Sequence, residues 1–257
     1  MNNETEFSAR HVEPQFDTGM SDQIAIGLIT LSSDIVTEYE LRRMLPPDGI
    51  TLATTRIKTH NPITIENLAG HALEIAQAGT LYDPPGCIDV FAYACTSGSA
   101  ISSQEELEAK LHASVPGAKL TSPMTGALRA FKALGIRKVS MLTPYPDDVA
   151  EIMIRCVEKA GVSVVGSTSF HIENDYEIGN IAPQCISEAA QVAVDPAADA
   201  LFIPCTGFRT SSVIHDLEQR LGVPVITAHQ AMLWDALTLA GFKRPLSGYG
   251  RLLTTLS

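Results

Sequence analysis

Two segments of the chain are near copies of each other. Asp89–Gly98 and Asp199–Phe208 both run from an aspartate through apolar residues to Cys-Thr. A second pair, Gly27–Asp34 and Ser140–Asp147, lies upstream of them. Counted from the threonine of the upstream copy to the cysteine, the two separations are 65 and 62 positions. This spacing predicts two copies of one structural unit.

Apolar runs of strand length alternate with amphipathic helical patterns in both copies. The strands are expected at Ile24–Ile29, Thr51–Arg56, Asp89–Tyr93, Val139–Leu142, Ser163–Thr168, Ala200–Ile203 and Val225–Thr227. Helices are expected at Ile65–Ala78, Gln104–Ala113, Gly126–Ala133, Val149–Ala160, Ile186–Val194, Ser212–Leu221 and Gln230–Ala240. Strands that are apolar on both faces and separated by helices are typical of parallel sheets. The sequence therefore predicts an α/β fold of two pseudo-symmetric, doubly wound parallel-sheet lobes.

The repeat also divides the chain. We expect a flexible N-terminal tail over residues 1–22, a first lobe over 23–122 and a second lobe over 123–227. Residues 228–257 are expected to form a C-terminal helix and tail that pack back on the lobes. In doubly wound folds ligands bind at the carboxyl ends of the strands, so the groove between the lobes is the expected site.

Charge and composition exclude several classes of protein. The chain of 257 residues has 29 acidic and 18 basic side chains, a formal net charge of −11, and no run rich in Lys and Arg. That balance argues against nucleic acid as a partner. No apolar stretch is long enough for a membrane span, and the first 22 residues lack the features of a signal peptide. We expect a cytoplasmic protein without a membrane partner.

The motifs of common cofactors are absent. The five cysteines form no CxxC pair and no HxxxH occurs, so neither a metal site nor a disulfide framework is expected. There is no GxGxxG or GxxxxGK[ST] loop and no lysine in a context typical of pyridoxal phosphate. We expect no cofactor. Cys87, Cys156 and Cys185 have no counterpart in the repeat, and helical patterns place Cys156 and Cys185 in the core.

Cys95 and Cys205 are different, because each ends a predicted strand at the same place in its repeat. Backbone N–H groups in such a turn are expected to lower the thiol pKa and to bind an anion. Two lobes that face each other would bring the sulfurs to opposite sides of one substrate. A cofactor-free racemase or isomerase needs such an acid/base pair. The alternative is that both cysteines are small core residues.

These cysteine motifs, Tyr93-Ala-Cys95-Thr-Ser-Gly-Ser and Cys205-Thr-Gly-Phe-Arg-Thr, resemble those of the Asp/Glu racemase superfamily. The branch that looks most similar contains maleate cis–trans isomerase and arylmalonate decarboxylase. Leu142-Thr-Pro-Tyr145 resembles its tyrosine loop, and Glu173–Gly179 resembles its asparagine-bearing segment. The resemblance implies an Asp/Glu racemase-like fold with the active site between the lobes.

The resemblance also implies roles for individual residues. Cys95 would be the nucleophile or first acid/base group, and Cys205 the opposing proton donor. Arylmalonate decarboxylases keep only one of these thiols, so the presence of both argues against decarboxylation. Substrate-binding donors would come from Thr96, Ser97, Tyr145, Asn174, Thr206 and Gly207.

Asp34 departs from the family pattern, since maleate isomerases have an asparagine in this loop. An ionised aspartate only accepts hydrogen bonds, so Asp34 suits a substrate ammonium better than a carboxylate. This version of the loop resembles the ectoine-utilization member of the superfamily, which points to ectoine or hydroxyectoine catabolism. Asp34 is equally well explained as the N-cap of a helix over Ile35–Leu45.

Two further residues have open alternatives. Arg209 lies four residues after Cys205, where it would either clamp a substrate carboxylate or form a structural salt bridge. His229 follows the predicted strand Val225–Thr227 and would either line the groove or make a structural hydrogen bond.

The sequence leaves three functions open. The leading hypothesis is a cofactor-independent two-cysteine racemase or isomerase of a small dicarboxylate or amino-dicarboxylate. Maleate-to-fumarate isomerisation is the alternative within that class, and a catalytically idle metabolite-binding protein is the alternative outside it. We also expect a homo-oligomer, either a dimer or a tetramer.

Overall fold

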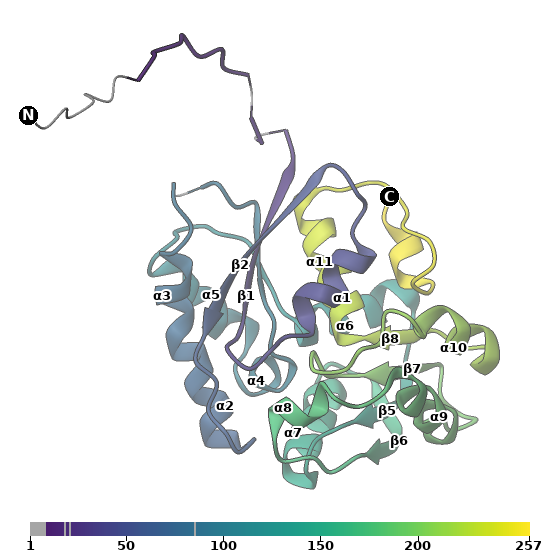
Figure 1. Ribbon diagram of the computed structural model, residues 1–257. Coiled ribbons are helices and arrows are strands. Elements are labelled where there is room, and N and C mark those ends of the chain that lie inside the picture. The colour runs from purple at the N-terminus through teal and green to yellow at the C-terminus, as the bar shows by residue number, and fades with distance from the viewer. Residues whose placement is uncertain (1–8, 18, 21, 85) are drawn as a thin grey trace, which may run out of the picture.

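Each repeated unit forms one four-stranded parallel sheet in the computed structural model, which describes residues 9–17, 19–20, 22–84 and 86–257 (Figure 1). The first sheet has the order β2-β1-β3-β4 and the second the order β6-β5-β7-β8. All pairings are parallel. The strands are β1 Ile24–Leu31, β2 Ile50–Ile57, β3 Val90–Tyr93, β4 Leu120–Thr121, β5 Lys138–Thr143, β6 Ser163–Ser169, β7 Ala200–Ile203 and β8 Val225–Thr227. The identical order confirms the predicted α/β fold of two matching lobes.

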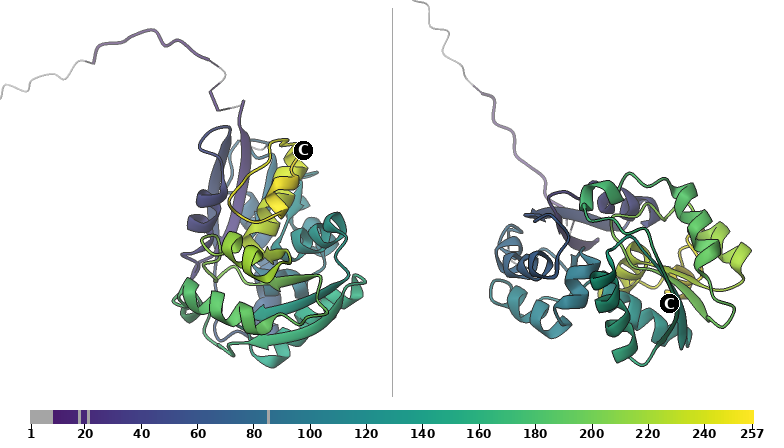
Figure 2. Two further views of the ribbon diagram at one scale, coloured as in Figure 1. Left: turned by 90° about the vertical axis from the view of Figure 1, so that its right-hand side faces the viewer. Right: turned by 90° about the horizontal axis from the view of Figure 1, so that it is seen from below.

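Helices cover both faces of each sheet, as a doubly wound fold requires (Figures 1 and 2). In the first half of the chain they are α1 Thr37–Met44, α2 Ile65–His71, η1 Ala72–Glu74, α3 Ile75–Gly79, α4 Thr96–Ile101, α5 Gln104–His112 and α6 Pro123–Leu134. In the second half they are α7 Asp147–Lys159, α8 Asp175–Ile178, α9 Pro183–Ala193, α10 Ile214–Leu221, α11 Ala228–Ala240 and η2 Leu252–Thr255.

Local sequence signals set several helix ends. Ser122 accepts a hydrogen bond from Thr125 N, and proline occupies the first turn of α6. At the other end Gly135 adopts φ 69°, a left-handed conformation that glycine takes without steric cost. The expected helix over Ile65–Ala78 is instead divided into α2, η1 and α3.

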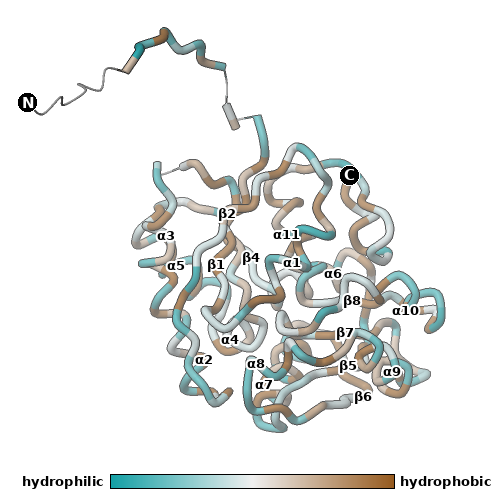
Figure 3. Tube along the Cα trace, viewed as in Figure 1, coloured by the Kyte–Doolittle hydropathy of each residue, from teal (hydrophilic) through white to brown (hydrophobic). Residues whose placement is uncertain are grey.

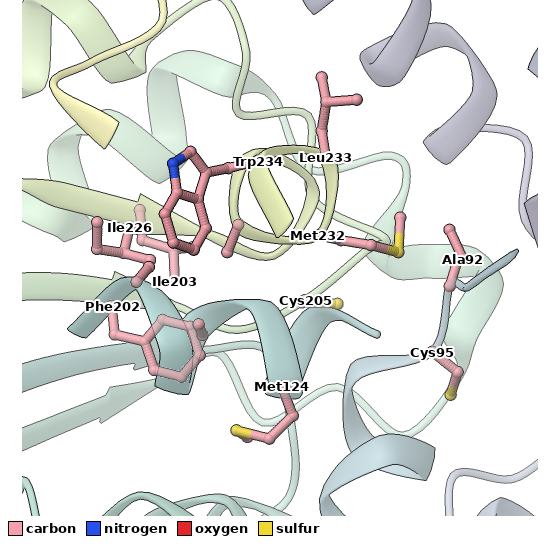
Figure 4. Close-up of a cluster of buried hydrophobic side chains, with 14 of the residues drawn as sticks. Ala92, Cys95, Met124, Phe202, Ile203, Cys205, Ile226, Met232, Leu233 and Trp234 are labelled. Carbon is pink, nitrogen blue, oxygen red and sulfur yellow. The ribbon is translucent and has the colours of Figure 1, made fainter. Parts of the chain in front are cut away.

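The core is continuous between the lobes. Hydrophobic residues follow the strands β7 and β8, whereas hydrophilic residues gather around the helix α10 (Figure 3). Phe202 of β7, Met124 of α6 and Met232 of α11 belong to one buried cluster that also contains Cys95 and Cys205 (Figure 4). The backbones of α6 and α11 come very close at Gly126, since even a Cβ there would lie only 2.4 Å from Ala231 O. This close approach needs glycine at position 126. The two thiols therefore rest on tightly packed elements of both lobes.

The C-terminal helix returns to the first lobe, although it follows the last strand of the second. Helix α11 packs against α6, α1 and β3, and ten of its thirteen residues are buried.

The predicted tail is described only in part. Residues 9–17 form no helix or strand and are exposed, while residues 1–8, 18 and 21 lie outside the described part of the chain. Within the described ranges, no helix is both long and apolar enough to cross a membrane.

Candidate active site

The strand order places the site. In the first sheet β2 lies on one side of β1, and the chain then crosses to β3 on the other side; β6 and β7 flank β5 in the same way. At such a reversal of strand order a crevice opens at the carboxyl ends of the two strands, here β1 and β3 in one sheet and β5 and β7 in the other. Cys95 follows β3 and Cys205 follows β7. Both cysteines line one cavity, which we call the thiol pocket. It is lined by Leu31, Thr59, His60, Ile63, Leu68, His71, Cys95, Thr96, Ser97, Tyr145, Asp175, Cys205 and Thr206.

Cys95 occupies the N-cap position of α4. Its sulfur accepts a hydrogen bond from Gly98 N at 3.3 Å and lies 3.9 Å from Ser97 Oγ. The phenol of Tyr93 lies against the same turn, since a Cβ at Gly98 would be 2.5 Å from Tyr93 Oη and 3.0 Å from Cys95 Sγ. Glycine is therefore needed at position 98 for the turn that presents the thiol.

Cys205 lies in a turn that does not continue into a helix. Its sulfur accepts a hydrogen bond from Gly207 N at 3.2 Å. Tyr145, in the loop after β5, lines the same pocket, and its phenol acts to lower the pKa of the Cys205 thiol. Thr206 joins the lobes, because its Oγ1 lies 3.4 Å from Ala94 O.

Burial controls the protonation of both thiols. Each cysteine is 3% exposed, and this desolvation raises the pKa of Cys95 to about 11 and that of Cys205 to about 12. The N–H groups of Gly98 and Gly207 and the two phenols act in the opposite direction, but they do not offset the burial. The sequence-based expectation of lowered thiol pKa values is therefore wrong. Both groups are neutral at pH 7.

Asp175, rather than Asn174, lines the thiol pocket. The side chain of Asn174 caps α8 by accepting a hydrogen bond from Tyr176 N at 3.1 Å. Asp175 Oδ2 accepts a 2.6 Å hydrogen bond from Ser33 Oγ of the first lobe. Burial, with a further contribution from Asp34, raises the pKa of Asp175, while the bond from Ser33 opposes this shift.

Asp34 and Gly207 line a second cavity, which shares Leu31, Asp175 and Thr206 with the thiol pocket. The Asp34 carboxylate accepts hydrogen bonds from Val36 N at 2.8 Å, Thr37 N at 2.9 Å and Thr30 Oγ1 at 2.6 Å. These bonds satisfy N–H groups at the start of α1, although the N-cap position of that helix is Val36 rather than Asp34.

Arg209 and His229 are not brought to the thiol pocket. The guanidinium of Arg209 donates to Ile181 O at 3.0 Å. His229 is fully buried, with Nε2 3.1 Å from Thr37 Oγ1 and Nδ1 4.0 Å from Glu40 Oε2. Both side chains have structural partners instead.

The other three cysteines lie away from the pocket. Cys87 is exposed and Cys156 is partly buried. Cys185 is also exposed, contrary to its predicted core position, because α9 buries the face formed by Ile186, Ser187 and Ala190. Among the described residues, no group of three or more His, Cys, Asp or Glu side chains is arranged to hold a metal ion.

Sequence comparison places the chain in a family. The family model for arylmalonate decarboxylase matches residues 94–253, which include both Cys-Thr turns. The chain belongs to the arylmalonate decarboxylase family. It is 32% identical over 139 residues to arylmalonate decarboxylase of Bordetella bronchiseptica, a match that covers 53% of this chain and 58% of the Bordetella enzyme.

Members of this family with a different reaction match over nearly their whole length. The maleate isomerase of Geobacillus stearothermophilus is 26% identical over 250 residues, which are 91% of this chain and 99% of that enzyme. The fold of maleate cis–trans isomerase from Nocardia farcinica superposes with a TM-score of 0.82 at 22% identity and covers 91% of this chain and 99% of that one. That structure is of a cysteine-to-serine mutant with a covalently bound succinylcysteine intermediate.

Four polar residues that line the pocket, Thr59, His60, His71 and Asp175, are not expected from the sequence. Asp175 is adjacent to the expected Asn174, and only the start of α8 decides which of them faces the cavity. His71 closes α2 and lines the pocket although it is only 1% exposed. The apolar pattern around Leu68 places His71 on a helix, but no motif marks it as part of a site.

Proposed function

We propose that this protein is a cofactor-independent isomerase of a small dicarboxylate, with Cys95 and Cys205 as the reacting pair. The observation that carries the proposal is that both thiols, delivered by equivalent turns of two lobes, line one pocket. A metabolite-binding protein would need no second thiol in a matched position. The names of the relatives support isomerisation of maleate more than any other reaction of this class.

The chemistry needs one thiolate and one thiol. We place the thiolate at Cys95, because its sulfur lies at the N-cap of α4, where the N–H groups at the helix start favour an anion. One proton must therefore leave the pair before catalysis begins. Hydroxyl groups of Thr96, Ser97, Tyr145 and Thr206 line the pocket and are suited to hold a carboxylate of the substrate.

With maleate, the Cys95 thiolate would add to C2 and form a C–S bond. The electron pair of the double bond moves to C3, where it takes the proton of Cys205 and leaves a succinyl group on Cys95. Rotation about the C2–C3 single bond follows. The Cys205 thiolate then removes a proton from C3, the C–S bond breaks, and fumarate leaves. The covalent adduct known in the Nocardia enzyme supports this sequence.

Racemisation of an amino-dicarboxylate is the second candidate, and the position of Asp175 favours it. No Lys or Arg lines the thiol pocket, whereas Asp175 does. No hydrogen bond from a described residue reaches its Oδ1, so that oxygen is available to a substrate ammonium. Asp34 adds negative charge beside it. An aspartate-like substrate from ectoine or hydroxyectoine would fit this candidate.

One experiment separates the candidates. The protein is incubated in deuterium oxide with maleate, and separately with L-aspartate and L-threo-3-hydroxyaspartate, and followed by proton NMR. Fumarate in the maleate sample, with no Cα–H exchange in the amino-acid samples, selects cis–trans isomerisation. Cα–H exchange in an amino-acid sample selects racemisation. In the Cys205→Ser variant, an intact mass raised by one succinyl group after maleate would support the covalent route. If neither reaction occurs at millimolar substrate, the proposed function is contradicted.

Asp175→Asn tests the substrate charge. If Asp175 binds an ammonium, the substitution should lower kcat/KM for the amino-dicarboxylate about 10- to 150-fold, the equivalent of about 1.5–3 kcal/mol. For maleate the amide would donate a hydrogen bond to a carboxylate, so kcat/KM should stay equal or rise. A loss of equal size on both substrates would mean that Asp175 only stabilises the pocket through Ser33.

A further inference from the structure

One wall of the thiol pocket has no role in the reaction described so far. It is formed by α2 and the loop before it, and it contributes Thr59, His60, Ile63, Leu68 and His71. His71 is the deepest polar group of this wall, with an exposed fraction of 1%. Its ring stacks on that of His60, with the ring centroids 5.9 Å apart.

The hydrogen bonds of His71 define its protonation. The backbone N–H of His60 donates to His71 Nε2 at 3.4 Å, so Nε2 is an acceptor. Burial, and then the charge of His60, lower the pKa of His71, while Glu74 raises it. The ring is therefore neutral at pH 7, and a neutral imidazole that accepts at Nε2 has its proton on Nδ1.

That N–H group lacks a partner. His71 Nδ1 is buried and makes no hydrogen bond to the described residues. Thr96 Oγ1, on the neighbouring α4, is also buried, unpaired and part of a residue that lines the pocket. An unpaired buried polar group is costly, so such groups usually have a ligand or water as partner. Two of them on one cavity indicate a ligand with acceptor atoms.

The chemistry of the lining restricts that ligand. Since no Lys or Arg lines the pocket, a carboxylate there must be held by neutral donors. The hydroxyl groups near the thiols account for one carboxylate. On the α2 wall Thr59 is bonded to Ser33 and His60 lies 3.7 Å from Glu74, so the unpaired donor there is His71. Resting on the isomerase function proposed above, we propose that His71 donates its Nδ1–H to the second carboxylate of the substrate and selects dicarboxylates over monocarboxylates.

Ligand binding tests this role without turnover. Succinate and butyrate have the same chain length and differ in one carboxylate, so their dissociation constants are measured by calorimetry on the full chain. In His71→Leu the affinity for succinate should fall about 10- to 150-fold, the loss expected for one hydrogen bond to a charged group. The affinity for butyrate should change less than about threefold.

Substitution by an amide provides the matched control. In His71→Asn the amide Nδ2 takes nearly the position of the ring Nδ1, so this variant should retain succinate binding to within about fivefold. His112→Leu removes a histidine outside the pocket, where the ring contacts Ala118 O, and should change neither constant. Thermal melting of each variant identifies any that does not fold. If His71→Leu does not fold, His71→Asn carries the test, and a loss of succinate affinity larger than about fivefold in that variant would count against the role of Nδ1.

The outcomes separate this inference from the proposed function. An equal loss for both ligands, or a wild type that does not prefer succinate, would overturn the role of His71 even if the protein isomerises maleate. Selective loss of succinate binding in His71→Leu, in a protein that turns over neither candidate substrate, would support His71 and contradict the isomerase.

Discussion

The turns that present the two thiols start from the same Cys-Thr sequence but are built differently. After β3 the chain enters α4, so Cys95 is bonded to the N–H three residues later. After β7 no helix forms before α10, and Cys205 is bonded to the N–H two residues later. The tyrosines differ as well, since Tyr93 belongs to the strand that leads to Cys95 and Tyr145 to a loop beside Cys205. A duplicated unit has thus kept the thiol and changed its surroundings.

This difference indicates a division of labour. Cys95 lies at the N-cap of α4, whereas Cys205 lies in a turn outside any helix with Tyr145 in the same pocket. The positive end of the helix dipole favours a thiolate at Cys95. The group that ionises more readily suits the nucleophile or base, and the group that keeps its proton suits the acid. The following predictions compare the two half-sites, by which we mean the surroundings of Cys95 and the surroundings of Cys205.

Removal of either thiol should have the largest effect. Cys95→Ser and Cys205→Ser should each lower kcat/KM about 10²- to 10⁴-fold, because a serine hydroxyl is a much weaker acid than a thiol. Initial rates on the best substrate measure this, with thermal melting as a check of folding. Cys156→Ser, which is outside the pocket, is the control. Full activity in either single variant would show that one thiol is sufficient.

Loss of a phenol should have the next largest effect, and it should be unequal. Tyr145→Phe removes a hydroxyl group that lines the pocket and acts to lower the pKa of the Cys205 thiol, so kcat/KM should fall about 10- to 150-fold, the equivalent of one charged hydrogen bond. Tyr93 does not line the pocket, and Tyr93→Phe should cost less than about tenfold. A larger loss in Tyr93→Phe than in Tyr145→Phe would exchange the roles given to Cys95 and Cys205.

Alkylation by iodoacetamide should distinguish the two thiols directly. Because Cys87 and Cys185 are exposed, the measurement needs a background with Cys87, Cys156 and Cys185 changed to serine. The raised pKa values leave few thiolates at pH 7, so labelling should accelerate about tenfold per pH unit from pH 7 to 10. Peptide mass spectrometry should find Cys95 labelled before Cys205. A plateau below pH 9 would contradict the effect of burial, and a dicarboxylate should protect both sites.

The smallest effect is expected at Asp34. Its carboxylate already accepts hydrogen bonds from two N–H groups at the start of α1, and an asparagine oxygen accepts them equally well, so Asp34→Asn should lower the free energy of unfolding by less than about 1 kcal/mol. Asp34→Ala should cost about 0.5–2 kcal/mol in urea unfolding. If Asp34→Asn instead lowered kcat/KM for an amino-dicarboxylate tenfold or more at unchanged stability, Asp34 would contact the substrate as the loop sequence suggested.

The fold follows closely from the sequence, because long apolar strands and amphipathic helices carry a clear period. Seven of the eight strands coincide with the expected ones to within two residues at each end. The missing strand, β4, is only two residues long. Helix α4 was also missed, since its sequence of Thr, Ser, Gly and Ala is equally typical of a loop.

The site was predictable as far as the repeat marked it. Cys95, Cys205 and Tyr145 lie at strand ends, where parallel topology decides the position of a side chain, and all three line the pocket. The direction of Arg209 depends on the turn that follows Cys205. No local pattern encodes the course of such a turn, so its bond to Ile181 could not be expected.

The return of α11 also has a consequence for how the chain folds during synthesis. The first sheet is complete in sequence by residue 121, but the helix that packs against β3 begins only at residue 228. As the chain leaves the ribosome, that apolar surface stays uncovered until the last part of the protein emerges. A fragment that ends after β8 would contain all the strands and both thiols. It would nevertheless expose the surface that Met232 and Leu233 cover, and we expect such a fragment to aggregate.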